Sequence, residues 1–131
     1  MPGLLTHLSV ALFGFLVFFV FRNYLYGIVF AIGHLIPDVI RFGVTGIIGG
    51  KHSFNEIIAH PLFWKLSFTH YVITWIIVLV IIFLVIFGLY KLKKISKKGF
   101  RKWFIANIIF FIAVMIHLIL DVLIIEKSYW T

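Results

Sequence analysis

Two pairs of a histidine and an aspartate, each four residues apart, lie in strongly apolar sequence: His34 with Asp38, and His117 with Asp121. On an α-helix this spacing places both side chains of a pair on one face. Ionisable side chains are costly within membrane hydrocarbon and therefore mark functional sites by default. Imidazole nitrogens beside carboxylate oxygens suit divalent transition metals. The pairs predict a site for a divalent metal, with zinc as the first choice and manganese or iron as alternatives.

The composition indicates that this site lies in a membrane. Of the 131 residues, 63% are hydrophobic and 12% are charged, which is too apolar for a water-soluble chain of this size. A helix needs about 20 residues to cross a bilayer. Four stretches approach or exceed this length, at residues 4–21, 24–48, 66–90 and 103–125, and a shorter helix is expected at 54–60. We therefore expect a single all-α domain, a polytopic membrane protein whose four transmembrane helices form two helical hairpins.

Basic residues set the expected orientation. Seven lysines and arginines lie in the loop 91–102, and short basic loops stay in the cytoplasm. This orientation places both termini and the loop near residues 49–63 outside, in a multi-pass protein of the plasma membrane. The loop would contact anionic lipid headgroups. The net charge of +8 therefore favours the lipid bilayer as partner and argues against nucleic acid.

Depth along the helices brings further histidines to the level of the two pairs. With a rise of about 1.5 Å per residue, counted from the basic loop, residues 7, 38 and 117 lie about 21–22 Å up, and residues 70 and 121 lie in the same upper third. Each helix thus contributes to one layer near the extracytoplasmic face. The expected metal ligands are His7, His34, Asp38, His70, His117, Asp121 and, from the outer loop, His60.

The outer loop carries its own polar pattern. Ser53 and Glu56 have the spacing of a capping box, and Pro61 would end the short helix that they begin. His52 and His60 fall at four-residue spacing from Glu56, so the three would line one face of a lid over the metal layer. Polar residues on the water side are more often simply solvated. His60 is the expected ligand among them.

The two halves of the chain show a weak internal repeat. Thr6-His7 recurs as Thr69-His70, and the two His-x-x-x-Asp pairs correspond. Both halves begin outside, cross inward and return, so an axis along the membrane normal would relate them in a parallel repeat. This symmetry would bring two sets of His, His and Asp face to face, for one metal ion or two.

The order of these motifs resembles the YdjM-like family of predicted membrane-bound metal-dependent hydrolases. The resemblance covers most of the chain by motif order and rests on His7, Asp38, His70, His117 and Asp121. The family's middle motifs read Leu-Pro-Asp-x-Asp-His and His-Arg-Gly-x-Thr-His-Ser. Residues 36–41 and 65–71 correspond to them here.

Three positions depart from the family's motifs. Ile40 replaces the second aspartate, Arg41 the following histidine, and Lys65 the first histidine of the other motif. Either the site is smaller, or His34, His60 and His52 substitute, or the chain is a divergent relative that has lost hydrolysis. The matching residues are still enough for one metal ion with an open position for water.

The resemblance implies hydrolysis by water that a metal ion activates. Asp38 or Asp121 would take the proton. Arg41, which we count with these two as a catalytic candidate, and Lys65 would neutralise a phosphate or carboxylate of the substrate, with snorkelling to the interface as the alternative. A lipid reaches a site in the membrane laterally, so we expect the substrate to be a lipid ester or phosphoester.

Two other functions stay open. Intramembrane histidines and aspartates also form pathways for metal ions or protons, so the chain could be a transporter. Against transport, residues 10–21, 76–89 and 104–114 are almost wholly apolar. In the third hypothesis the protein is a non-catalytic metal-binding or structural membrane protein whose polar layer joins the helices. An oligomer is compatible with each hypothesis.

Overall fold

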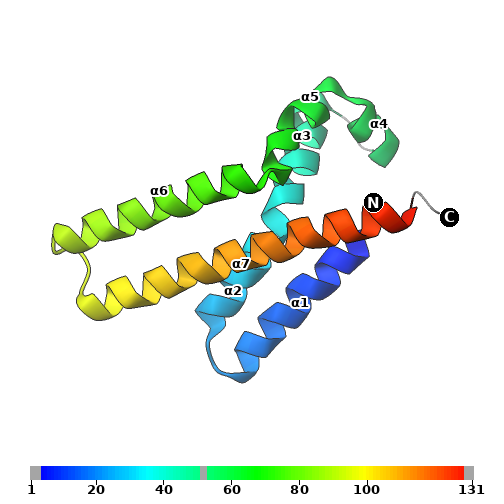
Figure 1. Cartoon of the computed structure of the whole chain (residues 1–131). Coiled ribbons are helices and arrows are strands. Elements are labelled where there is room, and N and C mark those ends of the chain that lie inside the picture. The colour runs from blue at the N-terminus through cyan, green and yellow to red at the C-terminus, as the bar shows by residue number, and fades with distance from the viewer. Residues whose placement is uncertain (1–3, 51–52, 129–131) are drawn as a thin grey trace.

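The computed structural model describes residues 4–50 and 53–128, and these residues form helices joined by short turns, without a strand (Figure 1). In chain order the elements are α1 (Leu4–Val20), α2 (Tyr24–Asp38), the π-helix η1 (Val39–Val44), α3 (Thr45–Gly49), α4 (Phe54–Ala59), α5 (Pro61–Lys65), the 3-10 helix η2 (Leu66–His70), α6 (Val72–Lys91) and α7 (Lys97–Ser128). The expected all-α class is confirmed.

Three helices are long and apolar enough to cross a membrane. They are Tyr24–Gly49, in which η1 joins α2 to α3 without a break, Val72–Lys91, and Lys97–Leu123. The first helix is also apolar but shorter, over Thr6–Val20. Three of the four expected spans therefore have the required length. The chain is a membrane protein by the length and composition of these helices.

Helices α1 and α6 end in the same way, with a residue in the left-handed conformation. Arg22 has a φ of 54° and Lys93 a φ of 57°. The next residue donates its backbone N–H to the carbonyl five positions earlier, at 2.9 Å in both helices. This Schellman geometry ends a helix and reverses the chain. Each hairpin thus has a tight turn, away from α3, α4 and α5 (Figure 1).

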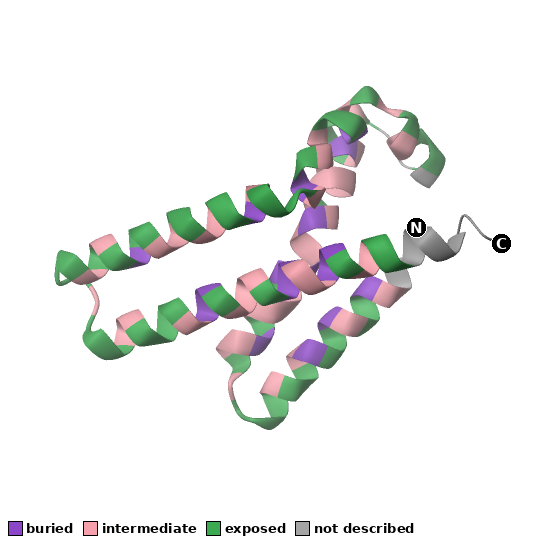
Figure 2. Cartoon of the chain, viewed as in Figure 1, coloured by how far each residue is buried: buried purple, intermediate pink, exposed green. Residues whose placement is uncertain are grey.

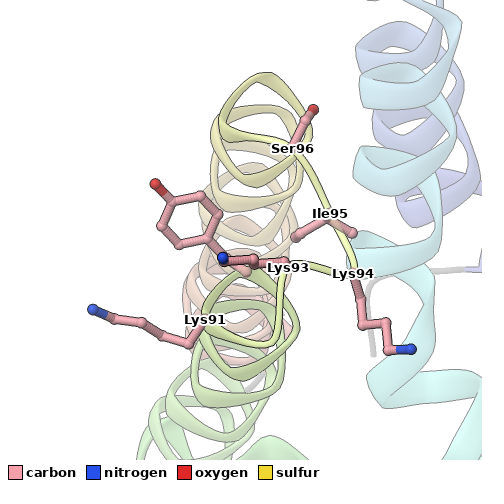
Figure 3. Close-up of a pocket in the computed structure, with 6 residues that line it drawn as sticks. Lys91, Lys93, Lys94, Ile95 and Ser96 are labelled. Atoms are coloured by element: carbon pink, nitrogen blue, oxygen red, sulfur yellow. The ribbon is translucent and has the colours of Figure 1, made fainter.

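The loop expected at residues 91–102 is in part helical. Ser96 accepts a hydrogen bond from the backbone N–H of Gly99 at 3.1 Å, which is the pattern of a helix N-cap. Residues 97–102 consequently belong to α7, and the turn shrinks to residues 92–96. In this turn Lys91 and Lys94 extend to opposite sides, so their ammonium groups do not converge (Figure 3).

The third apolar stretch also starts differently from its expected boundary. Residues 66–70 form η2, and α6 begins at Val72. Thr69 donates its hydroxyl proton to the carbonyl of Leu66 at 2.9 Å, and the indole N–H of Trp75 donates to the carbonyl of Thr69 at 2.7 Å. The first bond lies within η2, and the second joins η2 to the first turn of α6. Together they keep η2 distinct from α6.

Helices α2 and α7 form the centre of the molecule, with α1 packed on α2 and α6 packed on α7. Trp75, Val114 and Leu118 form an apolar core where α6 meets α7, and Ile36 and Ile40 of the α2–η1 helix pack against it. Figure 2 shows the contrast between α6, which is mostly exposed, and α7, whose buried residues recur along its length. The exposed side chains of α6 are large and apolar, consistent with contact to lipid.

A glycine permits the close approach of α2 and α7. A Cβ atom at Gly33 would lie 2.7 Å from the backbone oxygen of Phe110 and 3.2 Å from the Cβ of Ala113. Backbone cannot yield at such distances without a shift of one helix. Gly33 therefore sets the separation of the two helices that carry the His-x-x-x-Asp pairs.

We expect Gly33→Ala to destabilise the protein by about 1–3 kcal/mol, because it overpacks the α2–α7 contact. Gly88→Ala is the matched control, since a Cβ there meets nothing within 4 Å and the gain in helix propensity is similar. Thermal unfolding in detergent measures the effect. Equal unfolding midpoints of the two variants would contradict this role of Gly33.

Candidate metal centre

A buried group of histidines and aspartates joins the elements at the end of the molecule away from the basic turn. It is built from His7 of α1, His34 and Asp38 of α2, His70 of η2, and His117 and Asp121 of α7. Two sets each have all their ligand atoms within 4.8 Å of one another: His7, His34 and His117, and Asp38, His70, His117 and Asp121. The chain thus has histidine and aspartate groups positioned to hold a metal ion.

Asp121 lies at the centre of this group. Its Oδ1 is 3.1 Å from Nε2 of His7, and its Oδ2 is 3.3 Å from Nε2 of His70 and 3.2 Å from Nε2 of His117. Asp38 lies further out, with Oδ1 3.4 Å from His70 and 3.8 Å from His117. One carboxylate therefore contacts histidines from three elements.

These separations match the spacing of ligands around a small ion. Ligand atoms about 2.0–2.1 Å from a tetrahedral zinc ion lie roughly 3.3 Å from one another. The contacts of Asp121 with His70 and His117, at 3.3 and 3.2 Å, fit this spacing. The 3.8 Å between Asp38 and His117 is wider. Within the second set, His70 and His117 therefore have the spacing of zinc ligands relative to Asp121.

Several buried polar atoms of this group have no hydrogen bond. They are both ring nitrogens of His117 and Oδ1 of Asp38. The carboxylate oxygens near His117 lie at contact distance but without the alignment that a hydrogen bond needs. A buried polar atom without a partner costs about 1–3 kcal/mol. A cation between these atoms would remove that cost, and imidazole nitrogens with carboxylate oxygens are a donor set for zinc, manganese or iron.

Thr69 fixes which nitrogen of His70 faces the aspartates. The Thr69 hydroxyl gives its proton to the carbonyl of Leu66 at 2.9 Å, so at 3.0 Å its oxygen accepts the N–H at Nδ1 of His70. Nε2 of His70 then points its lone pair toward Asp38 and Asp121. Neighbours of this kind orient the histidine ligands of metal sites.

A lone pair that faces two carboxylates requires a cation. Burial lowers the pKa of His70, but its contacts with Asp121 and then with Asp38 outweigh burial, so the pKa is raised above its ordinary value of 6.5. In the absence of a metal, Nε2 of His70 therefore holds a proton more readily than a free imidazole does. A proton and a metal ion would compete for this nitrogen.

A second chain of hydrogen bonds reaches Asp121 from α2. The carbonyl of Ala113 can only accept, so at 3.3 Å it accepts the N–H at Nδ1 of His34. Nε2 of His34 then accepts from Nδ1 of His7 at 3.3 Å, and Nε2 of His7 lies 3.1 Å from Asp121. When His34 is neutral, Nδ1 of His7 carries the proton that His34 accepts. The contact between Nε2 of His7 and Asp121 is then a hydrogen bond only if this second nitrogen carries a proton too. His34 therefore orients His7, and His7 faces the same carboxylate as His70 and His117.

The π-helix η1 decides which residues after Asp38 reach the site. Such turns are rare and occur frequently at functional sites. Ile40, one departure from the family's motifs, packs on the apolar core. Thr45 donates its hydroxyl proton to the carbonyl of Arg41 at 2.6 Å, which satisfies one carbonyl of the irregular turn. Lys65, the third departure, is exposed.

The structure brings six of the seven expected ligands together. His60 belongs to neither set, because its Nδ1 accepts the backbone N–H of Leu62 at 3.2 Å and caps α5. His52 lies outside the described residues. The role of Thr69 in orienting His70 was not expected from the sequence. The repeated Thr-His dipeptide is the signal that could have identified this threonine.

We expect purified protein to bind a divalent metal and Asp121→Asn or His117→Gln to weaken binding by about 100-fold or more, because each change removes a ligand or its charge. His60→Gln is the matched control, since His60 lies outside both sets. Elemental analysis after exposure to Zn²⁺, Mn²⁺ or Fe²⁺ measures the metal. A wild-type protein that stays metal-free would contradict the site.

We expect Thr69→Val to weaken metal binding by about 10–100-fold, because Nδ1 of His70 loses the hydroxyl that orients its ring. Thr74→Val is the control: Thr74 donates to the carbonyl of Phe68 at 2.8 Å, on the same turn, and contacts no histidine. Competition with a chromophoric chelator gives both affinities. Equal losses in the two variants would indicate a general effect on η2.

Comparisons with known proteins leave the family open. No protein-family model matches the chain, and no curated protein or solved structure gives a significant match. The resemblance to the YdjM-like family stays a prediction from the motifs. The candidate metal centre rests on the geometry of its own residues.

Proposed function

We propose that this chain is a membrane-embedded, metal-dependent hydrolase that cleaves an ester or phosphoester bond of a lipid. The observation that carries the proposal is the convergence of His70 and His117 on Oδ2 of Asp121 at 3.3 and 3.2 Å, beside an oxygen of Asp38 that has no hydrogen bond. Two histidines and one carboxylate are a ligand set of catalytic zinc sites, which keep a fourth position for water. Zinc is accordingly the metal that we propose.

Asp38 is suited to move the proton of the reaction. A divalent ion bound at this site would lower the pKa of a coordinated water to near 7. Oδ1 of Asp38 lies 3.4 Å from Nε2 of His70 and has no hydrogen bond, so it could accept a proton from that water. Attack of a water on the carbonyl carbon or phosphorus would break the bond to the leaving oxygen, and Asp38 would return the proton to that oxygen.

The polar side chains favour chemistry over conduction. Among the described residues, Asn107 is the only buried polar side chain between the metal centre and the basic turn. Its amide donates to the carbonyl of Leu79 at 3.0 Å. A transport pathway needs polar groups or water across the whole membrane. A site confined to one end of the bundle supports binding and catalysis.

We infer that α1 completes a fourth crossing and that the metal centre lies near the extracytoplasmic face. α1 contributes His7 to the same layer as the longer helices, and its 17 residues span about 25 Å, close to the hydrocarbon thickness of about 30 Å. The lysines of the α6–α7 turn lie at the other end, where they would contact anionic headgroups in the cytoplasmic leaflet of the plasma membrane.

We expect zinc-loaded protein in liposomes to hydrolyse a lipid ester or phosphoester, and Asp38→Asn to lower kcat by about 10²–10⁴-fold through loss of the proton acceptor. Asp38→Asn should retain more metal than Asp121→Asn, because Asp38 lies further from His117. A panel of lipid esters and phosphoesters, assayed with and without chelator, provides the measurement.

The controls separate catalysis from the other hypotheses. His60→Gln should keep both metal and activity. Metal-loaded protein that hydrolyses nothing in the panel would contradict the proposal and favour the structural hypothesis. Flux of protons or divalent ions above that of empty vesicles would favour transport instead.

A further inference from the structure

Arg41 is held at the edge of the metal centre by contacts with α5. Its Nε donates to the backbone oxygen of Phe63 at 3.3 Å. The guanidinium carbon lies 3.9 Å from the centre of the Phe63 ring and 5.6 Å from that of Trp64. A cation over an aromatic face is stabilised by the ring quadrupole. The guanidinium is therefore fixed in place, unlike a long side chain that extends freely to the membrane surface.

The two terminal nitrogens of this guanidinium have no hydrogen-bond partner recorded among the described residues. Arginine has five N–H donors, and within this part of the chain the recorded bond of Arg41 comes from Nε. The ion pairs recorded among the described residues all involve histidines, so neither aspartate forms one with Arg41. The two terminal nitrogens form the planar fork that binds phosphate or carboxylate through two parallel hydrogen bonds. A partly buried cation with a free fork is suited to an incoming anion.

The charges of the centre set the charge of that anion. Asp38 and Asp121 lie close enough to Arg41 for electrostatic attraction, and His70 close enough for repulsion when protonated. A divalent ion would be neutralised by the two carboxylates. The positive charge of Arg41 would then be the unmatched charge of the loaded site. A phosphodiester group carries a single negative charge, whereas a carboxylic ester carries none.

We infer that Arg41 binds the substrate and that the substrate is a phosphodiester lipid, whose phosphate accepts hydrogen bonds from the free edge of the guanidinium. The inference rests on the proposed function, because it names the substrate class of the same site. It assigns to Arg41 a discrimination between a charged phosphodiester and a neutral carboxylic ester of similar apolar size. Phe63 and Trp64 keep the guanidinium in the orientation that this recognition requires.

The first experiment measures binding without hydrolysis. Dimethyl phosphate, a soluble phosphodiester anion, is titrated into zinc-loaded protein in detergent and followed by calorimetry. We expect Arg41→Gln to weaken binding at least 10-fold. The affinity of Arg41→Lys should fall between those of wild type and Arg41→Gln, because lysine keeps the charge but lacks the fork. Arg22→Gln is the matched control, since Arg22 is exposed in the α1–α2 turn. Metal content and unfolding midpoint of each variant verify that the site is intact.

The second experiment separates a lipid headgroup from free phosphate. Nanodiscs that contain phosphatidylglycerol are compared with nanodiscs of a neutral diacyl lipid, and inorganic phosphate is added as competitor. Tighter binding to phosphatidylglycerol in wild type, lost in Arg41→Gln, supports a lipid phosphodiester. Displacement of the bound phosphatidylglycerol nanodiscs by inorganic phosphate at low concentration overturns the lipid assignment. The same binding in wild type and Arg41→Gln overturns the role of Arg41.

Kinetics distinguish a failure of this inference from a failure of the proposed function. With both lipids as substrates, Arg41→Gln should lower the ratio of kcat/KM for the phosphodiester to kcat/KM for the neutral ester about 100-fold. If the phosphodiester binds in an Arg41-dependent way but is not hydrolysed, the proposed function is overturned, whereas anion recognition by Arg41 is supported. Hydrolysis of the neutral ester alone, unaffected by Arg41→Gln, overturns the inference and keeps the hydrolase.

Discussion

An aspartate among apolar helices must be protonated, paired or bound to a cation, and Asp121 lies within 3.3 Å of histidines of α1, η2 and α7. The cost of a bare buried charge is large, so these contacts constrain every element that supplies one. α7 must pass close to α2, which Gly33 allows, and η2 must stay a separate turn for His70 to reach inward. The polar group therefore determines how the apolar helices pack, because hydrophobic burial gives membrane helices little preference among arrangements.

Helix identity and depth could be predicted from the sequence, whereas irregular turns could not. Apolar length locates the long helices, and a fixed rise per residue brings His7 to the level of Asp38 and His117. The same rules miss η1 and η2, because hydrogen bonds from side chains to nearby backbone carbonyls hold these turns. The indole N–H of Trp75 fixes η2, and the hydroxyl of Thr45 supports η1. A pattern of apolar residues contains no information on either bond.

Within the metal centre, the sequence indicates which residues meet but not how they are oriented. Spacing and depth select six of the residues that converge. The tautomers of His34 and His70 depend instead on the carbonyl of Ala113 and on the hydroxyl of Thr69, whose alignment only the fold sets. His60 was expected as a ligand, but its local role as the N-cap of α5 accounts for its position. Its place directly before Pro61 suits a helix N-cap, and that competing role could have been read from the sequence.

The π-helix η1 explains how Asp38 and Arg41 can serve one site without neutralising each other. At a separation of three residues on a regular α-helix, an aspartate and an arginine share a face and pair readily. The wider turn of a π-helix moves Arg41 off that face and toward Phe63, whose backbone oxygen and ring hold it. Asp38 keeps an oxygen without a hydrogen bond toward His70 and His117. A regular helix would favour an ion pair in which the acid and the base cancel, whereas η1 leaves the carboxylate for a metal or a proton and the guanidinium for an anion.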